Sequence, residues 1–192
     1  MVSIFPLLFA AVLAPTMPDA PAPVRADTSV AGVALPTTVE VGGRTLVLNG
    51  AALRKKAVFK VYVAGLYLPT KEKSAEKIIA ADEPRRMIMH FVRNVGSEPI
   101  CEAWTEGLSA NTPDASAELT AQFKTLCGYM EGVDERDKLV FTYVPGTGTT
   151  VEVKGKTKGV IAGKAFADAM LRTWIGTKPG PGAGFKRSVL GS

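Results

Sequence analysis

Histidine and cysteine are scarce in this chain of 192 residues, which has one histidine and two cysteines. The single histidine, His90, argues against a His-rich metal site, and a Ser-His-Asp triad would have to be built around it. It lies in the strand-like segment RRMIMHFVR, so we interpret it as an ordinary strand residue. Cys101 and Cys127 have no zinc-site spacing, and the tail segment GPGAGFKRS lacks the spacing of a phosphate loop. We therefore expect no metal and no cofactor, and we assign no catalytic residue.

The chain also has no long run of residues with charge of one sign. The net charge is +5 and the isoelectric point is near 9.2, with basic residues scattered along the chain. The densest basic cluster, LRKKAVFK, has no adjacent aromatic platform and no recognised nucleic-acid motif, so we expect no nucleic-acid partner. Lys55 and Lys56 are interpreted as a solvated strand edge, where lysine discourages pairing with another chain.

The apolar run over residues 4–14 is too short to span a bilayer as a stable helix. A Pro- and Ala-rich stretch follows it, which predicts a signal peptide over residues 1–26, with cleavage after Ala26 or, if Pro21 is tolerated, after Ala20. The first residues contain no Lys or Arg, so a misplaced start or an uncleaved anchor stays open.

Cleavage after Ala26 would leave residues 27–192 as one exported domain, periplasmic or secreted, without a stable membrane span. We expect this domain to be a monomer. In an oxidising compartment Cys101 and Cys127 can form one disulfide between two helices, and two buried thiols are the alternative.

Strand-like patterns dominate from about Val39, beginning with a hairpin that turns at Gly42 and Gly43. Residues 48–71 are interpreted as a long strand with one apolar face and one mixed face, and a mixed face can line a pocket. The apolar face carries Phe59, Val61, Val63 and Tyr67, and the mixed face carries Lys60, Tyr62, Ala64, Leu66 and Leu68.

Helical patterns interrupt the strands. A short helix is predicted over residues 72–82, a longer one from Ser97, and another opening at residues 112–114. After the strands KLVFTYV, TTVEVK and TKGVIA, the segment KAFADAMLRTWIG predicts a final helix, and the tail beyond it is rich in Gly and Pro. Strands on both sides of a helical pair indicate an α+β fold, an antiparallel sheet with helices on one face and a cleft between the layers.

Two segments carry a resemblance to a known family. NGAALRKKAVFKVYVAGLYLP and KGVIAGKAFADAMLRTWIGTKP, in this order, resemble the chalcone isomerase-like family in its short secreted bacterial branch, over residues 39–191. The resemblance implies an open-faced β-sandwich, in which a large antiparallel sheet is covered by a layer of helices with a ligand cleft between them.

The resemblance also implies three cleft residues. Arg54 matches an arginine that holds the substrate in the plant enzymes, Tyr62 matches a hydroxyl residue in the cleft, and Thr173 stands where they carry Ser or Thr. From the residues themselves, Arg54 could instead pair with an internal carboxylate, Tyr62 could simply pack in the sheet, and the Thr173 hydroxyl could bond to its own helix.

The segment GSEPICEAWTEGL departs from the plant enzymes, because it lacks their tyrosine and asparagine. Without these groups, ring closure of a chalcone would lose substrate orientation and proton transfer. We therefore expect a protein that does not cyclise chalcones. Members that lost catalysis resemble lipid carriers, so we expect a small apolar acid such as a fatty acid, with its carboxylate on Arg54 and its chain among apolar walls. Two alternatives stay open: a cofactor-free isomerase, which would be an intramolecular lyase of the chalcone isomerase type acting on an unknown substrate, and a non-binding interaction module.

Overall fold

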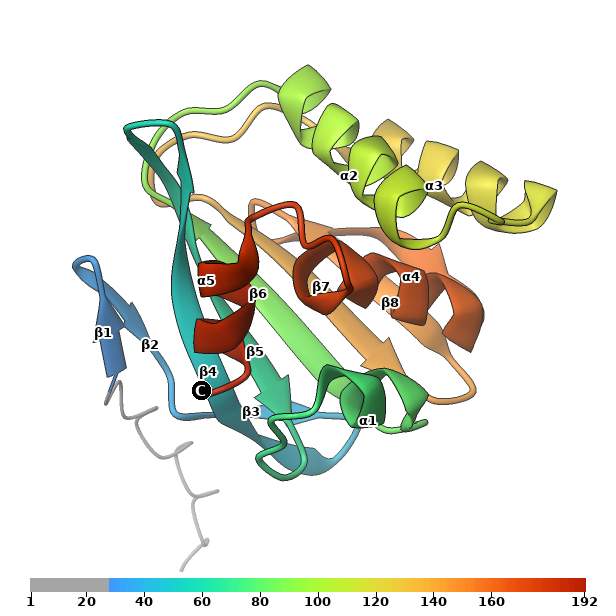
Figure 1. The fold of residues 1–192 in the computed structure, drawn as a ribbon, viewed down its shortest axis with the longest axis horizontal. Coiled ribbons are helices and arrows are strands. Elements are labelled where there is room, and N and C mark those ends of the chain that lie inside the picture. The colour runs from blue at the N-terminus through green and yellow to red at the C-terminus, as the bar shows by residue number, and fades with distance from the viewer. Residues whose placement is uncertain (1–27) are drawn as a thin grey trace, which may run out of the picture.

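The structure is a computed structural model that describes residues 28–192 as nine strands and five helices (Figure 1). The strands are β1 (Thr28–Val30), β2 (Val33–Leu35), β3 (Thr38–Val41), β4 (Arg44–Lys56), β5 (Phe59–Leu68), β6 (Arg85–Phe91), β7 (Lys138–Val144), β8 (Gly148–Val153) and β9 (Lys156–Ile161). The helices are α1 (Ala75–Ala80), α2 (Ser97–Asn111), α3 (Ala117–Tyr129), α4 (Lys164–Ile175) and α5 (Ala183–Val189). The predicted signal peptide, residues 1–26, lies outside the described residues.

Strands β3 to β9 form one antiparallel sheet of seven strands, in which each strand pairs with its neighbours in the sequence. The five helices lie over one face of this curved sheet (Figure 1). The predicted α+β class and the predicted open-faced β-sandwich, a large antiparallel sheet covered by a layer of helices, are therefore confirmed. No helix within residues 28–192 is long and apolar enough to cross a membrane.

The stretch that we interpreted as a single strand, residues 48–71, contains a hairpin. Strand β4 ends at Lys56, the chain turns at Ala57 and Val58, and β5 begins at Phe59. Ala57 has a φ of 53°, a left-handed conformation that is uncommon for a residue other than glycine. The interpretation was wrong because this turn has no glycine, asparagine or proline to mark it.

The sheet has a hydrophobic core on each face. The mixed face of β5, with Tyr62, Ala64, Leu66 and Leu68, packs in the large core under the helices. The face with Val63 and Tyr67 packs in a smaller core with the β1–β2 hairpin, and the Tyr67 hydroxyl donates to the Pro36 carbonyl at 2.9 Å. The sequence pattern did not predict that hairpin, because two strands of three residues carry too little alternation to be recognised.

The helical pair begins and ends differently from the prediction. Thr112 does not open the second helix but ends α2, where its amide bonds to the Leu108 carbonyl. Helix α3 starts later because the Ser116 hydroxyl accepts from the Leu119 amide, the usual arrangement of a helix N-cap.

A disulfide joins the two helices. Cys101 of α2 and Cys127 of α3 are bonded, with their Cα atoms 5.1 Å apart, so this prediction is confirmed. The bond closes a loop with a sequence separation of 26 residues, which in the chain-entropy account stabilises the fold by about 3.5 kcal/mol.

The Gly- and Pro-rich tail contains a helix that the sequence pattern did not predict. Helix α5 packs against β4 so closely that a Cβ atom at Gly50 would lie 2.3 Å from the Ser188 carbonyl oxygen. Asn49, also on β4, donates to the Val189 carbonyl at 3.0 Å and exchanges two further hydrogen bonds with the backbone of Glu72. Two adjacent residues of β4 thus hold the end of the chain over the sheet.

Candidate functional site

The hairpin turn places Arg54 of β4 directly opposite Tyr62 of β5. Residues paired in this way in neighbouring strands point to the same face of a sheet. Tyr62 belongs to the core under the helices, so Arg54 also faces that layer. Two of the three predicted cleft residues are therefore brought together.

Tyr62 is buried, with 8% of its surface exposed, and its hydroxyl oxygen accepts a hydrogen bond of 3.2 Å from the indole Nε1 of Trp174. Burial raises the pKa of Tyr62 to about 12, although the hydrogen bond from Trp174 and the charge of Arg54 both act to lower it. The phenol is therefore neutral at physiological pH. No acceptor for its proton lies among residues 28–192, so this proton can be donated to a ligand.

Arg54 is half-buried, and its guanidinium Nη1 donates to the carbonyl of Gly180 at 2.5 Å. It forms no ion pair with any residue in the described part of the chain. The internal carboxylate that a purely structural arginine would need is thus missing from residues 28–192. The positive charge is met by a neutral carbonyl, which leaves it available to an anion.

The segment after α4 covers this pair of side chains. Gly180 supplies the carbonyl on Arg54, and the ring of Phe185 in α5 meets the Tyr62 ring edge-on with centroids 6.1 Å apart. The Asn111 amide fixes the start of the segment, because it donates to the Lys178 carbonyl at 2.8 Å and accepts from the Lys178 amide at 2.9 Å. The C-terminal part of the chain therefore covers the site.

An apolar cavity lies on the other side of Trp174, between the sheet and α4. Its volume is about 20 Å³, room for little more than one water molecule. The lining residues are Leu66, Arg85, Met87, Phe141, Tyr143, Thr149, Ala167, Met170, Leu171 and Trp174.

Of the polar side chains at this cavity, Arg85 and Tyr143 have partners within the protein, and the buried Thr149 hydroxyl has no hydrogen-bond partner among the described residues. Arg85 pairs with Asp168 at 2.5 Å, and Asp168 also accepts from Lys164 at 2.6 Å. The Tyr143 hydroxyl donates to Asp82 at 2.6 Å, and burial together with this carboxylate raises the pKa of Tyr143 to about 12. This ion-paired cluster lies at the cavity, and no signal in RRMIMHFVR distinguished the buried Arg85 from the half-buried Arg86 and the exposed Arg93.

Thr173 is placed differently from the other two predicted residues. It is buried, and its hydroxyl donates to the Met170 carbonyl of its own helix at 2.7 Å. Its side chain packs on Gly107 of α2, where an added Cβ atom would lie 2.9 Å from the Thr173 side chain. No hydrogen bond joins Thr173 to Arg54 or Tyr62. The hydroxyl is engaged in the bond to its own helix that the sequence also allowed.

Known proteins share this fold. The profile of a family described as chalcone isomerase-like matches residues 27–191. The chain belongs to the chalcone isomerase-like family. Among solved structures, it is similar to the crystal structure of a fatty-acid binding protein of Arabidopsis thaliana, with a TM-score of 0.65 and 18% identity over 83% of this chain and 92% of that chain. No curated protein matches the sequence significantly.

The site of this chalcone isomerase-like protein is suited to holding an anion. Helix α2 presents Ile100, Trp104 and Leu108 to the core, so its buried face offers apolar side chains and one indole N–H. Among the described residues, no carboxylate or histidine contacts Arg54 or Tyr62 and could act there as a general base. The arrangement supplies hydrogen-bond donors beside apolar walls.

Proposed function

We propose that this protein binds a fatty acid or a similar apolar acid, whose carboxylate takes the place of the Gly180 carbonyl on Arg54. One observation carries the proposal: an arginine without a carboxylate partner among the described residues lies opposite a buried, neutral tyrosine with a free proton. The guanidinium can donate to a carboxylate at two points, and the Tyr62 hydroxyl adds a third hydrogen bond.

The acyl chain would extend past Trp174 into the cavity under α4. This cavity is about 20 Å³, whereas sites that enclose ligands measure roughly 300 to 1,000 Å³, so the described form is closed. Met87 and Met170 line the cavity, and methionine side chains adapt to new shapes more easily than branched ones. Each buried methylene contributes about 0.8 kcal/mol, so a long chain can offset the cost of opening the layer.

Two further facts support parts of this proposal. The similar Arabidopsis structure is that of a fatty-acid binding protein, which supports the ligand class. The Cys101–Cys127 disulfide is of a kind that persists in oxidising compartments, which supports export to the periplasm or the medium. We propose loss of residues 1–26 on export, and an intact mass equal to the full-length chain in a membrane fraction would contradict it.

The experiment compares two ligands that differ only in the headgroup. Native mass spectrometry first asks whether the purified protein retains a lipid, and titration calorimetry then measures dodecanoic acid and dodecanol. The proposal expects the acid to bind at least tenfold more tightly than the alcohol, because only the acid can pair with Arg54. Equal affinities for the acid and the alcohol would contradict pairing of the carboxylate with Arg54. If neither ligand binds, the proposed function is wrong.

A further inference from the structure

The end of the β4–β5 hairpin exposes two large apolar side chains. Val58 is 85% exposed and Phe59 is 57% exposed, and they are adjacent in the sequence. We define residues 55–60 as the hairpin tip. The tip lies at one end of the hairpin, away from α1 (Figure 1), and both apolar side chains are largely open to solvent.

The hairpin tip is also basic. Lys55, Lys56 and Lys60 are exposed, and Lys55 lies directly opposite Lys60 in the strand pairing. Like charges in that position are destabilising, and none of the three lysines forms an ion pair with a residue that the structure describes. The Arg93 guanidinium lies over the Phe59 ring, 4.6 Å from its centroid, and adds a fourth positive charge.

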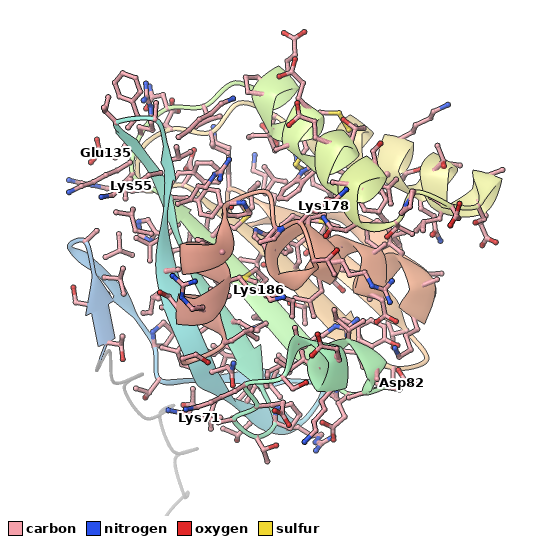
Figure 2. All side chains as sticks on the ribbon, viewed as in Figure 1. Lys55, Lys71, Asp82, Glu135, Lys178 and Lys186 are labelled. Carbon is pink, nitrogen blue, oxygen red and sulfur yellow. A yellow bond between two sulfur atoms is a disulfide. The ribbon has the colours of Figure 1, made fainter. Side chains whose placement is uncertain are left out.

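The acidic loop near the tip does not cancel this charge. Residues 134–137 bond through the backbone to Phe91, at the end of β6. Asp134 and Asp137 are both engaged by Lys154, at 3.8 and 3.4 Å. With Glu135 (Figure 2), this loop holds three carboxylates against the two cations Arg136 and Lys154, which leaves one net negative charge beside the four positive charges.

We propose that the hairpin tip docks on an anionic lipid bilayer, with Val58 and Phe59 inserted at the headgroup level and the three lysines on the lipid phosphates. A bilayer accepts a small apolar wedge flanked by basic residues, since insertion and electrostatic attraction add. A stable protein interface needs about 1,000 Å² or more of buried surface, which a turn with two apolar side chains does not supply.

This surface lies beside the proposed ligand site. Arg54 precedes the tip on β4, and Val58 follows it four positions later, roughly 13 Å along a strand. Docking at the tip would bring the guanidinium close to the lipid headgroups, where a fatty acid presents its carboxylate. The docking proposal does not depend on fatty-acid binding, and each can fail without the other.

The first test is co-sedimentation of the full chain with vesicles of phosphatidylglycerol and phosphatidylcholine, and with vesicles of phosphatidylcholine alone. We expect binding to the anionic vesicles, weakened at high salt. Replacing Val58 and Phe59 with serine should lower the partition coefficient at least tenfold. The matched control, Val160→Ser, removes an apolar side chain that is 48% exposed on β9 and should leave binding unchanged.

Two charge variants distinguish the effect of the tip lysines on vesicle binding from the effect of the net charge of the protein. Lys55, Lys56 and Lys60 are replaced with glutamine in one protein, and Lys71, Lys73 and Lys124 in the other, so both lose three exposed positive charges. Figure 2 labels Lys55 at the upper left and Lys71 at the lower left, well away from the tip. Each lysine near an anionic surface contributes a roughly fivefold effect, so the tip variant should bind about a hundredfold more weakly. An equal loss of vesicle binding in both variants would show that only the net charge of the protein matters, and would overturn the proposal.

A tryptophan at the tip reports insertion directly, whatever the N-terminal segment does. In Phe59→Trp, brominated acyl chains should quench the added fluorescence, while Val160→Trp should stay unquenched. The native Trp104 and Trp174 are buried and supply a constant background. Absence of quenching in Phe59→Trp, or tip variants that sediment as the wild type does, would overturn the proposal. Binding of a DNA or RNA oligonucleotide at the tip without vesicle binding would also overturn it, in favour of a nucleic-acid surface.

Discussion

The indole nitrogen of Trp174 donates a hydrogen bond to the hydroxyl oxygen of Tyr62 at 3.2 Å, and this bond determines which way the tyrosine can act. Because the oxygen accepts from the indole, the phenol proton is directed away from Trp174, and no residue in the described part of the chain accepts it. Arg54 lies opposite on the neighbouring strand. Two donors from two strands can therefore converge on one anion.

Removal of the guanidinium should weaken acid binding much more than folding. We expect Arg54→Ala to cost about 2 kcal/mol of binding, a roughly 30-fold higher Kd for dodecanoic acid, with a small change in Tm. Arg54→Lys should recover only part of the affinity, since an ammonium cannot make a planar two-point contact. The control is Arg172→Ala on α4, another half-buried arginine, whose side chain forms no hydrogen bond or ion pair in the described chain. A sharp fall in Tm with binding lost only in parallel would point to a structural arginine.

Removal of the Tyr62 hydroxyl should affect both binding and stability. Tyr62→Phe loses one donor to the acid, worth about 1 kcal/mol or a fivefold higher Kd, and it leaves the buried Trp174 N–H without its partner. Tyr67→Phe is the matched control, because it loses a hydroxyl that bonds to Pro36 on the opposite face of the sheet. This control should lower the free energy of unfolding and leave the Kd unchanged. Equal Kd values in both variants would remove Tyr62 from the site.

Stability should fall at high pH. Burial raises the pKa of Tyr62 from 10.0 to about 12, so between these values the unfolded chain loses a proton that the folded chain keeps. The stabilisation is present below pH 10 and is lost as the pH rises through about 12, by an amount on the order of 2 kcal/mol. Urea unfolding between pH 9 and 12 measures this slope. Tyr62→Phe should make it shallower, and an unchanged slope would contradict the prediction.

A methyl group at Gly50 should displace the end of the chain. In Gly50→Ala the new Cβ atom would meet the backbone carbonyls of Ser188 and Val189, which cannot move without α5. We expect a lower free energy of unfolding and faster amide exchange over Ala183–Val189. Gly128→Ala is the control, since nothing lies within 4 Å of a Cβ atom there and alanine favours a helix. Slow exchange of α5 in Gly50→Ala would show that the close approach is dispensable.

Local periodicity was sufficient where an element is long and half-buried. The strand-like segment RRMIMHFVR predicted β6, where the structure alternates buried Met87, Met89 and Phe91 with less buried residues, and the apolar stripe of KAFADAMLRTWIG predicted α4. The β1–β2 hairpin was not predicted because strands of three residues are too short to show a period. Helix α5 was not predicted because it lies in a tail rich in Gly and Pro, which indicated irregular structure.

The sequence by itself determined the α+β class and the two helices that carry Cys101 and Cys127. Through its resemblance to a family, it also indicated Arg54 and Tyr62 as candidate ligand-binding residues. Only the tertiary structure decided what surrounds them, because the partners come from distant parts of the chain. Gly180 lies 126 residues beyond Arg54, and Trp174 lies 112 residues beyond Tyr62. Such contacts depend on how the helix layer packs on the sheet, and this packing cannot be predicted from local propensity and periodicity.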